Sequence, residues 1–282
     1  MVVSSSSESR QADSRRLVNS FFNLAEKEAV DHFLRDGYII FDLEDSSLLN
    51  AIRKNIYQSA VELLGDRAQL DEDDFFDKTH EIISIKELND FRVKSITRMN
   101  HDKSLRPSIY ALGKKYIDWL VGNELAMQRN CNLSIQFPKD DSSLLPLHSD
   151  VWSGNSPYEI VFWLPFVNCY RTKSMFILPR HESEAVFRNF KQYSHLTAED
   201  FYRKIQDKLV WLDVKYGQGV IFSHSLLHGN RINEETETRW TMNVRFKSLL
   251  SPYGTKELGE SFLPITMRPA TRIGYNYIKP EC

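Results

Sequence analysis

The sequence of 282 residues has few cysteines, few glycines and prolines, and no long apolar run. Its three cysteines, Cys131, Cys169 and Cys282, are too few and too scattered for a disulfide scaffold or a zinc knuckle, so we expect a reducing, cytoplasmic environment. No stretch approaches the ~18 apolar residues of a membrane helix, so no membrane span is expected. The first residues lack the apolar core of a secretory signal, and residues 1–18 are predicted to form a disordered tail.

An excess of charge of either sign is also absent, since 36 basic residues stand against 38 acidic ones. This balance excludes nucleic acid and anionic membranes as bulk partners. Hydrophobic residues make up 41% of the chain, which is enough for a sizeable core. The sequence does not determine the oligomeric state.

The pattern of apolar residues predicts one domain over 19–282, because no linker rich in proline or glycine divides it. Apolar residues recur at helical spacing in segments 23–37, 45–65 and 107–122, whereas the acidic segment 67–81 is expected to be an exposed connection. The predicted parts are a helical front 19–128, a β-barrel core 130–250, a polar insert 183–208 that is capable of forming helix, and a C-terminal extension 251–282.

The texture of the sequence changes after Cys131. Short apolar runs rich in β-branched and aromatic residues follow one another between turn residues: "NLSIQF", "YEIVFWLPF", "SMFIL", "GVIF" and "RWTMNVRF". Such runs are typical of strands. Helices followed by many strands predict a mainly β fold, a barrel or sandwich that the helices buttress.

The stretch "LPLHSDVW" (145–152) carries His148 and Asp150 two residues apart. In an extended chain these side chains share one face, because successive side chains alternate. Two histidines and one carboxylate form the ligand set that suits non-haem Fe(II) with open coordination positions. H-x-D also occurs by chance in polar loops, so a third ligand is required.

Two histidines, His224 and His228, are candidates for that third ligand. Both follow the apolar run "GVIF", which favours an extended chain over the helix that an H-x-x-x-H zinc motif needs. Spacing alone leaves the choice between them open, and one of them is expected to lie in the core or behind the metal.

The run "RWTMNVRF" adds two arginines, Arg239 and Arg245, on the same strand face as Thr241 and Asn243. A barrel tolerates an inward arginine only when it meets an anion. The alternative is a strand face turned to solvent. An arginine fork binds a carboxylate in bidentate fashion, so an anionic substrate or co-substrate is the economical explanation.

These motifs resemble those of the phytanoyl-CoA dioxygenase-like branch of the Fe(II)/2-oxoglutarate oxygenases. The resemblance rests on "HSD", on "YGQGVIFSHSLLHG", on an arginine 11 positions after His228, on "FLRDGYIIFDL" and on "RTKSMFILPRHES", and it spans most of residues 25–250. It implies a double-stranded β-helix, a jelly-roll or cupin-like core, with N-terminal helices. "LPRHES" lacks the Gly-Ser that usually precedes its histidine.

The resemblance implies a role for each matching residue. His148, Asp150 and His228 would hold Fe(II) and be the catalytic centre, while His224 matches a common histidine that is not a ligand. Arg239 would bind the distal carboxylate of 2-oxoglutarate, and the residues on the strand that contacts this co-substrate would be Gln136 and Asn132. The candidates for the substrate wall are Trp152, Trp163, His181 and Arg245, and Arg245 could equally pair with an acid.

The implied activity couples oxidative decarboxylation of 2-oxoglutarate by O2 to hydroxylation, or a related C–H oxidation, of a small molecule. An aspartate at position 150 argues against chlorination, since chlorinating relatives have a small residue there. Residues 245–277 resemble a bacterial group found in surface-carbohydrate gene clusters, which implies a sugar or sugar conjugate of surface-polysaccharide or secondary metabolism. The alternatives are a cupin-like metal-dependent isomerase or hydrolase, and a non-catalytic 2-oxoglutarate sensor.

Overall fold

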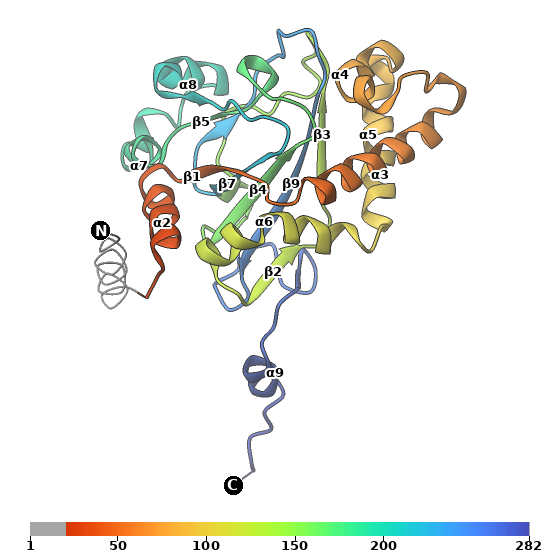
Figure 1. The fold of residues 1–282 in the computed structure, drawn as a ribbon. Coiled ribbons are helices and arrows are strands. Elements are labelled where there is room, and N and C mark those ends of the chain that lie inside the picture. The colour runs from red at the N-terminus through yellow and green to blue at the C-terminus, as the bar shows by residue number, and fades with distance from the viewer. Residues whose placement is uncertain (1–20, 282) are drawn as a thin grey trace, which may run out of the picture.

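A computed structural model describes residues 21–281, so the tail predicted for residues 1–18 lies outside the described residues (Figure 1). The front of the described chain is helical, as predicted, and its helices are α2 (Leu24–Asp36), α3 (Ser46–Leu64), α4 (Glu72–Ile82), α5 (Ile85–His101) and α6 (Leu105–Val121). Helix α2 ends at Gly37, whose φ of 81° and contact with the Leu226 side chain favour a residue without Cβ. Helix α3 begins at Asp45, whose carboxylate accepts the backbone N–H of Leu48.

The strands form two antiparallel sheets, which together make the double-stranded β-helix core. The larger sheet has the order β1-β7-β4-β9-β2-β10, with β3 also paired to β9, and the smaller has the order β6-β5-β8. The strands are β1 (Tyr38–Asp42), β2 (Leu125–Gln128), β3 (Asn132–Gln136), β4 (Glu159–Pro165), β5 (Phe176–Ile177), β6 (Val210–Trp211), β7 (Gln218–Ser223), β8 (His228–Gly229), β9 (Arg239–Ser248) and β10 (Phe262–Pro264).

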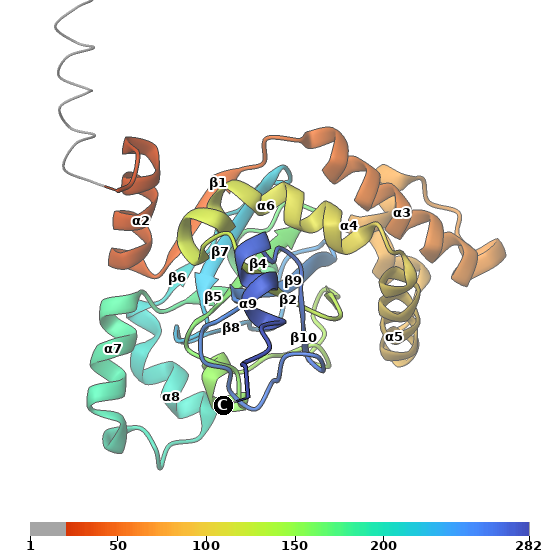
Figure 2. The ribbon, with the colours of Figure 1, turned by 90° about the horizontal axis from the view of Figure 1, so that it is seen from below.

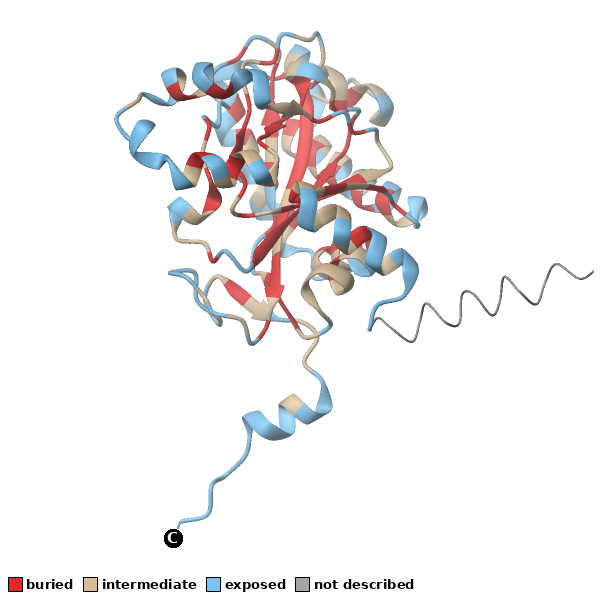
Figure 3. Ribbon diagram, turned by 90° about the vertical axis from the view of Figure 1, so that its left-hand side faces the viewer, coloured by how far each residue is buried: buried red, intermediate tan, exposed pale blue. Residues whose placement is uncertain are grey.

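Strand β9 is the longest strand and lies in the middle of the larger sheet. One edge pairs with β4 from Thr241 to Lys247, and the other pairs first with β3 and then with β2. Its outward face is wholly buried, because α4 and α6 pack against it, and carries Trp240, Met242, Val244 and Phe246. Figure 3 shows that burial concentrates on the sheet and on the helix sides that face it. The opposite face of β9 is therefore free to build an interior site.

Segment 67–81 differs from the expected exposed connection. It contains helix α4, whose N-cap Asp71 accepts the backbone N–H of Asp74, and both Phe75 and Phe76 have 0% exposure. The four acids of residues 71–74 suit the positive end of the helix dipole, so they mark a helix start as well as a soluble surface. The two aromatic side chains decide the packing by contacting Trp240.

Phe76→Ala is expected to lower the free energy of unfolding by about 3–5 kcal/mol, because it removes a fully buried aromatic ring and leaves a cavity. Chemical denaturation followed by far-UV circular dichroism measures this loss. The matched control is Phe190→Ala, whose ring is 38% exposed and should cost less than about 1.5 kcal/mol. Equal losses in the two variants would contradict the place of α4 in the core.

The insert forms helices, as predicted. Helix α7 (Arg180–Arg188) and helix α8 (Ala198–Ile205) lie together beside the small sheet, away from α3, α4 and α5 (Figure 2). Thr197 is the N-cap of α8, since its hydroxyl oxygen accepts the backbone N–H of Asp200 and its hydroxyl donates to the Asp200 carboxylate. The insert packs on the small sheet through an apolar cluster that includes Phe176, Leu178 and Leu227.

The C-terminal extension first returns to the body and then leaves it. Strand β10 pairs with β2, and the backbone N–H of Thr255 donates to the carbonyl of Gly154 in the turn after the H-x-D motif. Helix α9 (Pro269–Tyr275) then projects away from the body (Figures 1 and 3). Between residues 21 and 281, no helix is both long and apolar enough to cross a membrane.

Candidate metal centre

The three predicted metal ligands lie close together in the interior of the fold, next to the inward-facing side chains of β9. His148, Asp150 and His228 each offer a ligand atom, and these atoms lie within 4.8 Å of one another. The backbones of His148 and His228 exchange two hydrogen bonds of 2.9 and 3.0 Å, and their ring centroids are 4.3 Å apart. Among residues 21–281 this is the one cluster of side chains with metal-ligand geometry.

The chain around the H-x-D motif is extended over only part of its length. Ser149 has extended backbone angles, but Asp150 begins a 3-10 turn that runs to Ser153. The turn brings Asp150 to the same cavity as His148, and Asn155 secures it by donating to the Asp150 carbonyl. The shared orientation follows from one extended residue and a turn, and not from a continuous strand.

Both histidine ligands are oriented by backbone carbonyls. Nδ1 of His148 lies 2.8 Å from the carbonyl oxygen of Pro146, and Nδ1 of His228 lies 3.0 Å from that of Leu226. A carbonyl oxygen only accepts, so each Nδ1 carries the proton and each Nε2 keeps a lone pair. Metal-binding histidines use this arrangement, in which a hydrogen bond to the other ring nitrogen fixes the tautomer.

The site also sets the ionisation that a cation requires. Burial lowers the pKa of His228 to about 4, so its imidazole is neutral at physiological pH. Burial opposes ionisation of Asp150, but the positive charge of Arg245, whose Nη2 donates to both carboxylate oxygens, favours it, and the pKa of this carboxyl is lowered. Two neutral imidazoles and one carboxylate are the forms that bind a metal.

Arg239 is the second half of the site. It is 4% exposed, Nη1 donates to the carbonyl of Ser174 at 2.9 Å, and Nη2 donates to the Ser134 hydroxyl at 3.4 Å. Within the described residues it has no acidic partner, and its Nε has no acceptor. Burial lowers its pKa to about 10, so it is still a cation at neutral pH. A buried, uncompensated guanidinium calls for an anionic ligand.

The inner cavity has a volume of about 90 Å³. Three buried polar atoms on β9 without a partner among residues 21–281 belong to side chains of its wall, namely Arg239 Nε, Thr241 Oγ1 and Asn243 Oδ1. Ser134 lines it too, although the sequence reasoning did not single it out. The available signal was its position two residues after Asn132 on the same strand face.

The other two residues predicted to contact the co-substrate, Gln136 and Asn132, do not line this cavity. Gln136 is fully buried opposite Arg239 in the β3–β9 register, and it donates to the carbonyl of Arg231. Asn132 lies opposite Asn243 and lines an outer cleft instead of the inner cavity. Of these strand residues, Ser134 lines the inner cavity, whereas Gln136 and Asn132 do not.

The four predicted substrate residues lie in different places. Trp163 is buried in the wall of the inner cavity. Trp152 is 46% exposed and packs on Phe187 and Phe190 of the insert, and the side chain of His181 is 70% exposed at the start of α7. Neither lines the cavity or the cleft. Trp152 therefore packs against the insert.

Arg245, the fourth, is already paired. Its Nη2 donates to both carboxylate oxygens of Asp150 at 3.3 Å, its Nη1 donates to Gln128, and its Nε donates to Nε2 of His224 at 3.1 Å. The alternative that it pairs with an acid therefore matches the structure. His224 is fully buried behind Asp150, outside the triad.

An outer cleft of about 610 Å³ adjoins the metal centre and shares His148, Asp150, Asn243 and Arg245 with the inner cavity. Its walls are mostly polar, and the C-terminal extension supplies one of them through Lys256, Glu260, Ser261 and Phe262. The amide side chains in it are Gln128, Asn130, Asn132, Asn155 and Asn243. The cleft is a hydrophilic approach to the triad.

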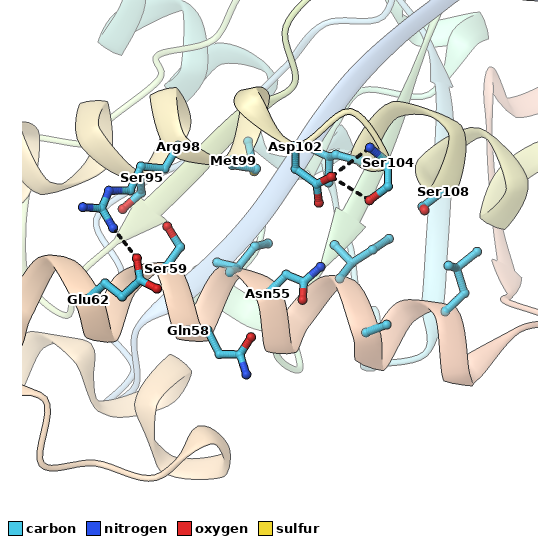
Figure 4. A pocket seen from close by; sticks show the side chains of 15 residues that line it. Asn55, Gln58, Ser59, Glu62, Ser95, Arg98, Met99, Asp102, Ser104 and Ser108 are labelled. Carbon is cyan, nitrogen blue, oxygen red and sulfur yellow. Dashed lines mark hydrogen bonds and ion pairs between the residues drawn. The ribbon is translucent and has the colours of Figure 1, made fainter.

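A separate cavity of about 320 Å³ lies between α3, α5 and α6 (Figure 4). Four of its polar side chains are paired with one another, in the Arg98–Glu62 ion pair and the Asp102–Ser104 hydrogen bonds. Among residues 21–281, the group with metal-ligand geometry lies at the triad and not in this cavity.

Comparison with known proteins identifies the fold. No family model matches the sequence, and no curated protein matches it. The structure is similar to SnoK, a non-heme alpha ketoglutarate dependent carbocyclase from nogalamycin biosynthesis, with 15% identity over 85% of this chain and 96% of that one and a TM-score of 0.51. It is also similar to EctD from S. alaskensis in its apo form, with 15% identity over 83% of this chain and 81% of that one and a TM-score of 0.50. The chain thus has the double-stranded β-helix fold of such oxygenases.

Proposed function

We propose that this chain is a non-haem Fe(II)- and 2-oxoglutarate-dependent dioxygenase. The observation that supports it best is a triad of two histidines and a carboxylate in the same cavity as a buried arginine that has no acidic partner. The triad suits Fe(II), and the arginine suits an anionic co-substrate. When bound, Fe(II) with 2-oxoglutarate and O2 supplies the oxidising chemistry.

The side chains of this chain would have distinct tasks. Nε2 of His148, Nε2 of His228 and the carboxylate of Asp150 would hold the iron and leave its other positions open. Arg239 would bind the distal carboxylate of 2-oxoglutarate, with Ser134 and Thr241 beside it. The apolar wall of the cavity would exclude water from the reaction, and it consists of Val161, Trp163, Met175 and Phe222.

The finer reaction is hydroxylation, or a related C–H oxidation such as desaturation, epimerisation or ring closure. Asp150 supports this choice over chlorination, because the family resemblance implies a small residue at this position in chlorinating enzymes, whereas here a carboxylate belongs to the triad. The amide-rich cleft supports a hydrophilic small molecule as substrate, such as a sugar or sugar conjugate of surface-polysaccharide or secondary metabolism. Amides both donate and accept hydrogen bonds, as hydroxyl groups do.

The test is anaerobic addition of Fe(II) and then 2-oxoglutarate to the purified apoprotein. A weak visible charge-transfer band is expected, followed by succinate formation when O2 is admitted. Metal binding without a band would favour a metal-dependent isomerase or hydrolase. A band without succinate, across a panel of sugars and sugar conjugates, would favour a 2-oxoglutarate sensor.

A further inference from the structure

Behind Asp150, on the side away from the cavity, lies a group of buried charged and polar side chains. Glu159 at the start of β4 is 1% exposed, Lys247 opposite it on β9 is 0% exposed, and His224 is 0% exposed. Burying so many ionisable groups is costly unless each is paired. Their arrangement therefore needs an explanation beyond packing.

The contacts within this group indicate which ring nitrogen of His224 carries the proton. The Nε–H of Arg245 donates to Nε2 of His224, so this nitrogen holds a lone pair and a neutral ring carries its proton on Nδ1. Nδ1 of His224 lies 3.1 Å from Oε2 of Glu159, within ion-pair distance, and neither atom has a hydrogen-bond partner in the described chain. The Glu159 side chain is therefore the group that faces a proton on Nδ1, and it favours the tautomer of His224 that accepts from Arg245.

The same guanidinium then orients Asp150. With Nε held by His224 and Nη1 by Gln128, its Nη2 is directed at both carboxylate oxygens of Asp150. Nε2 of His224 lies 3.4 Å from Oδ2 of Asp150, and both accept from Arg245 instead of bonding to each other. Lys247 lies opposite Glu159 in the β4–β9 register, and its Nζ donates to the carbonyl of Pro252.

We propose that Glu159, His224 and Arg245 form a positioning chain that holds the Asp150 carboxylate ready for the metal. These are positioning residues, because none of them belongs to the triad. The inference rests on the proposed function, since it concerns the metal site of that function. It also gives Arg245 a structural task in place of substrate binding. Partners behind the ligands commonly tune metal affinity by about 10–100-fold.

The decisive variant is Glu159→Gln. The backbone N–H of Ser156 donates to Oε1 of Glu159 at 2.9 Å and would keep the amide oxygen of the glutamine there. The amide NH2 would then face Nδ1 of His224 and force the proton to Nε2, opposite the Nε–H of Arg245. The hydrogen bond from Arg245 to His224 would then be lost, although glutamine has nearly the same size as glutamate.

The first measurement is Mn(II) affinity of the full chain, from the electron paramagnetic resonance signal of free Mn(II). Glu159→Gln is expected to weaken binding by about 10–100-fold. The matched control is Glu237→Gln, which removes another carboxylate, one that pairs with the buried Lys173, and should lower Tm but leave Mn(II) affinity unchanged. Equal affinity in wild type and Glu159→Gln would overturn the positioning chain, whereas failure of wild type to bind Mn(II) would overturn the proposed function.

The second measurement needs no metal. Nitrogen NMR of the apoprotein with 15N-labelled histidine, assigned by comparison with His224→Gln, reports which ring nitrogen carries the proton. Nδ1 protonation of His224 is expected in wild type and Nε2 protonation in Glu159→Gln. A neutral His224 that carries its proton on Nε2 in wild type would overturn the proposal even if the metal affinities agreed with it.

Discussion

Arg239→Met is expected to weaken 2-oxoglutarate binding by about 30- to 4,000-fold, which corresponds to the ~2–5 kcal/mol commonly lost when one member of a buried charge pair is removed. The apoprotein, in contrast, should be as stable as wild type or more stable. The reason is that the described chain offers this buried guanidinium no acid, so its desolvation is uncompensated until an anion binds. Arg239 would therefore both bind the co-substrate and lower the stability of the apoprotein.

Two measurements check this result. Isothermal titration of the Mn(II)-loaded protein with 2-oxoglutarate, without O2, gives the affinity, and urea denaturation of the apoprotein gives the stability. The matched control is Arg53→Met, since Arg53 is also largely buried but is paired with Glu72 at 3.2 Å. The control should lose stability and keep its affinity. The opposite pattern, in which Arg239→Met is destabilised and binds 2-oxoglutarate normally, would make Arg239 a structural residue.

Asp150→Asn is expected to reduce Fe(II) or Mn(II) affinity by at least ~1,000-fold and to abolish succinate formation, while the fold survives. Asp150 is the only anionic member of the triad, and Arg239 and Arg245 line the same cavity. Without its charge, a divalent cation would meet two neutral imidazoles and two cations. A contact between unit charges at 4 Å amounts to about 4 kcal/mol at an effective dielectric constant of 20, and the metal carries two charges.

A suitable control for this substitution is Asp140→Asn. Asp140 is 2% exposed and accepts the backbone N–H of Ser142, but it is not part of the triad. Its variant should keep both metal affinity and turnover. Undiminished succinate formation by Asp150→Asn would contradict the assignment of the metal centre, and far-UV circular dichroism would establish that the variant is folded.

The sequence predicted the elements that depend on local rules. Strand β9 alternates in the structure as its residues alternate in the sequence, and the caps at Asp45 and Thr197 lie where their side chains can accept backbone N–H groups. The helix α4 was missed because its charged residues outnumber the aromatic pair that anchors it. The overall composition of this helix reflects its solvent-facing side, whereas its packing depends on Phe75 and Phe76.

The same limit applies within the site. The kinds of ligand and their strand face follow from the sequence, because the periodicity of a strand is a local property. The partners of Arg245 and the contacts of Trp152 involve residues that are distant along the chain, and nothing in the local pattern identifies them. Ser134 was overlooked for a different reason, since a serine between apolar neighbours carries no charge to draw notice.

By itself, the sequence determined that this chain has a helical front, a β core, a histidine–carboxylate pair and inward arginines, because these depend on residue type and on spacing of a few positions. Spacing left the choice between His224 and His228 open, the family resemblance implied His228, and only the tertiary structure gives the physical reason. Both follow strand β7, but His228 lies in β8, where backbone pairing places it against His148, whereas His224 faces Glu159. That choice is made by contacts across some 65 to 80 positions of the chain, which a local pattern does not contain.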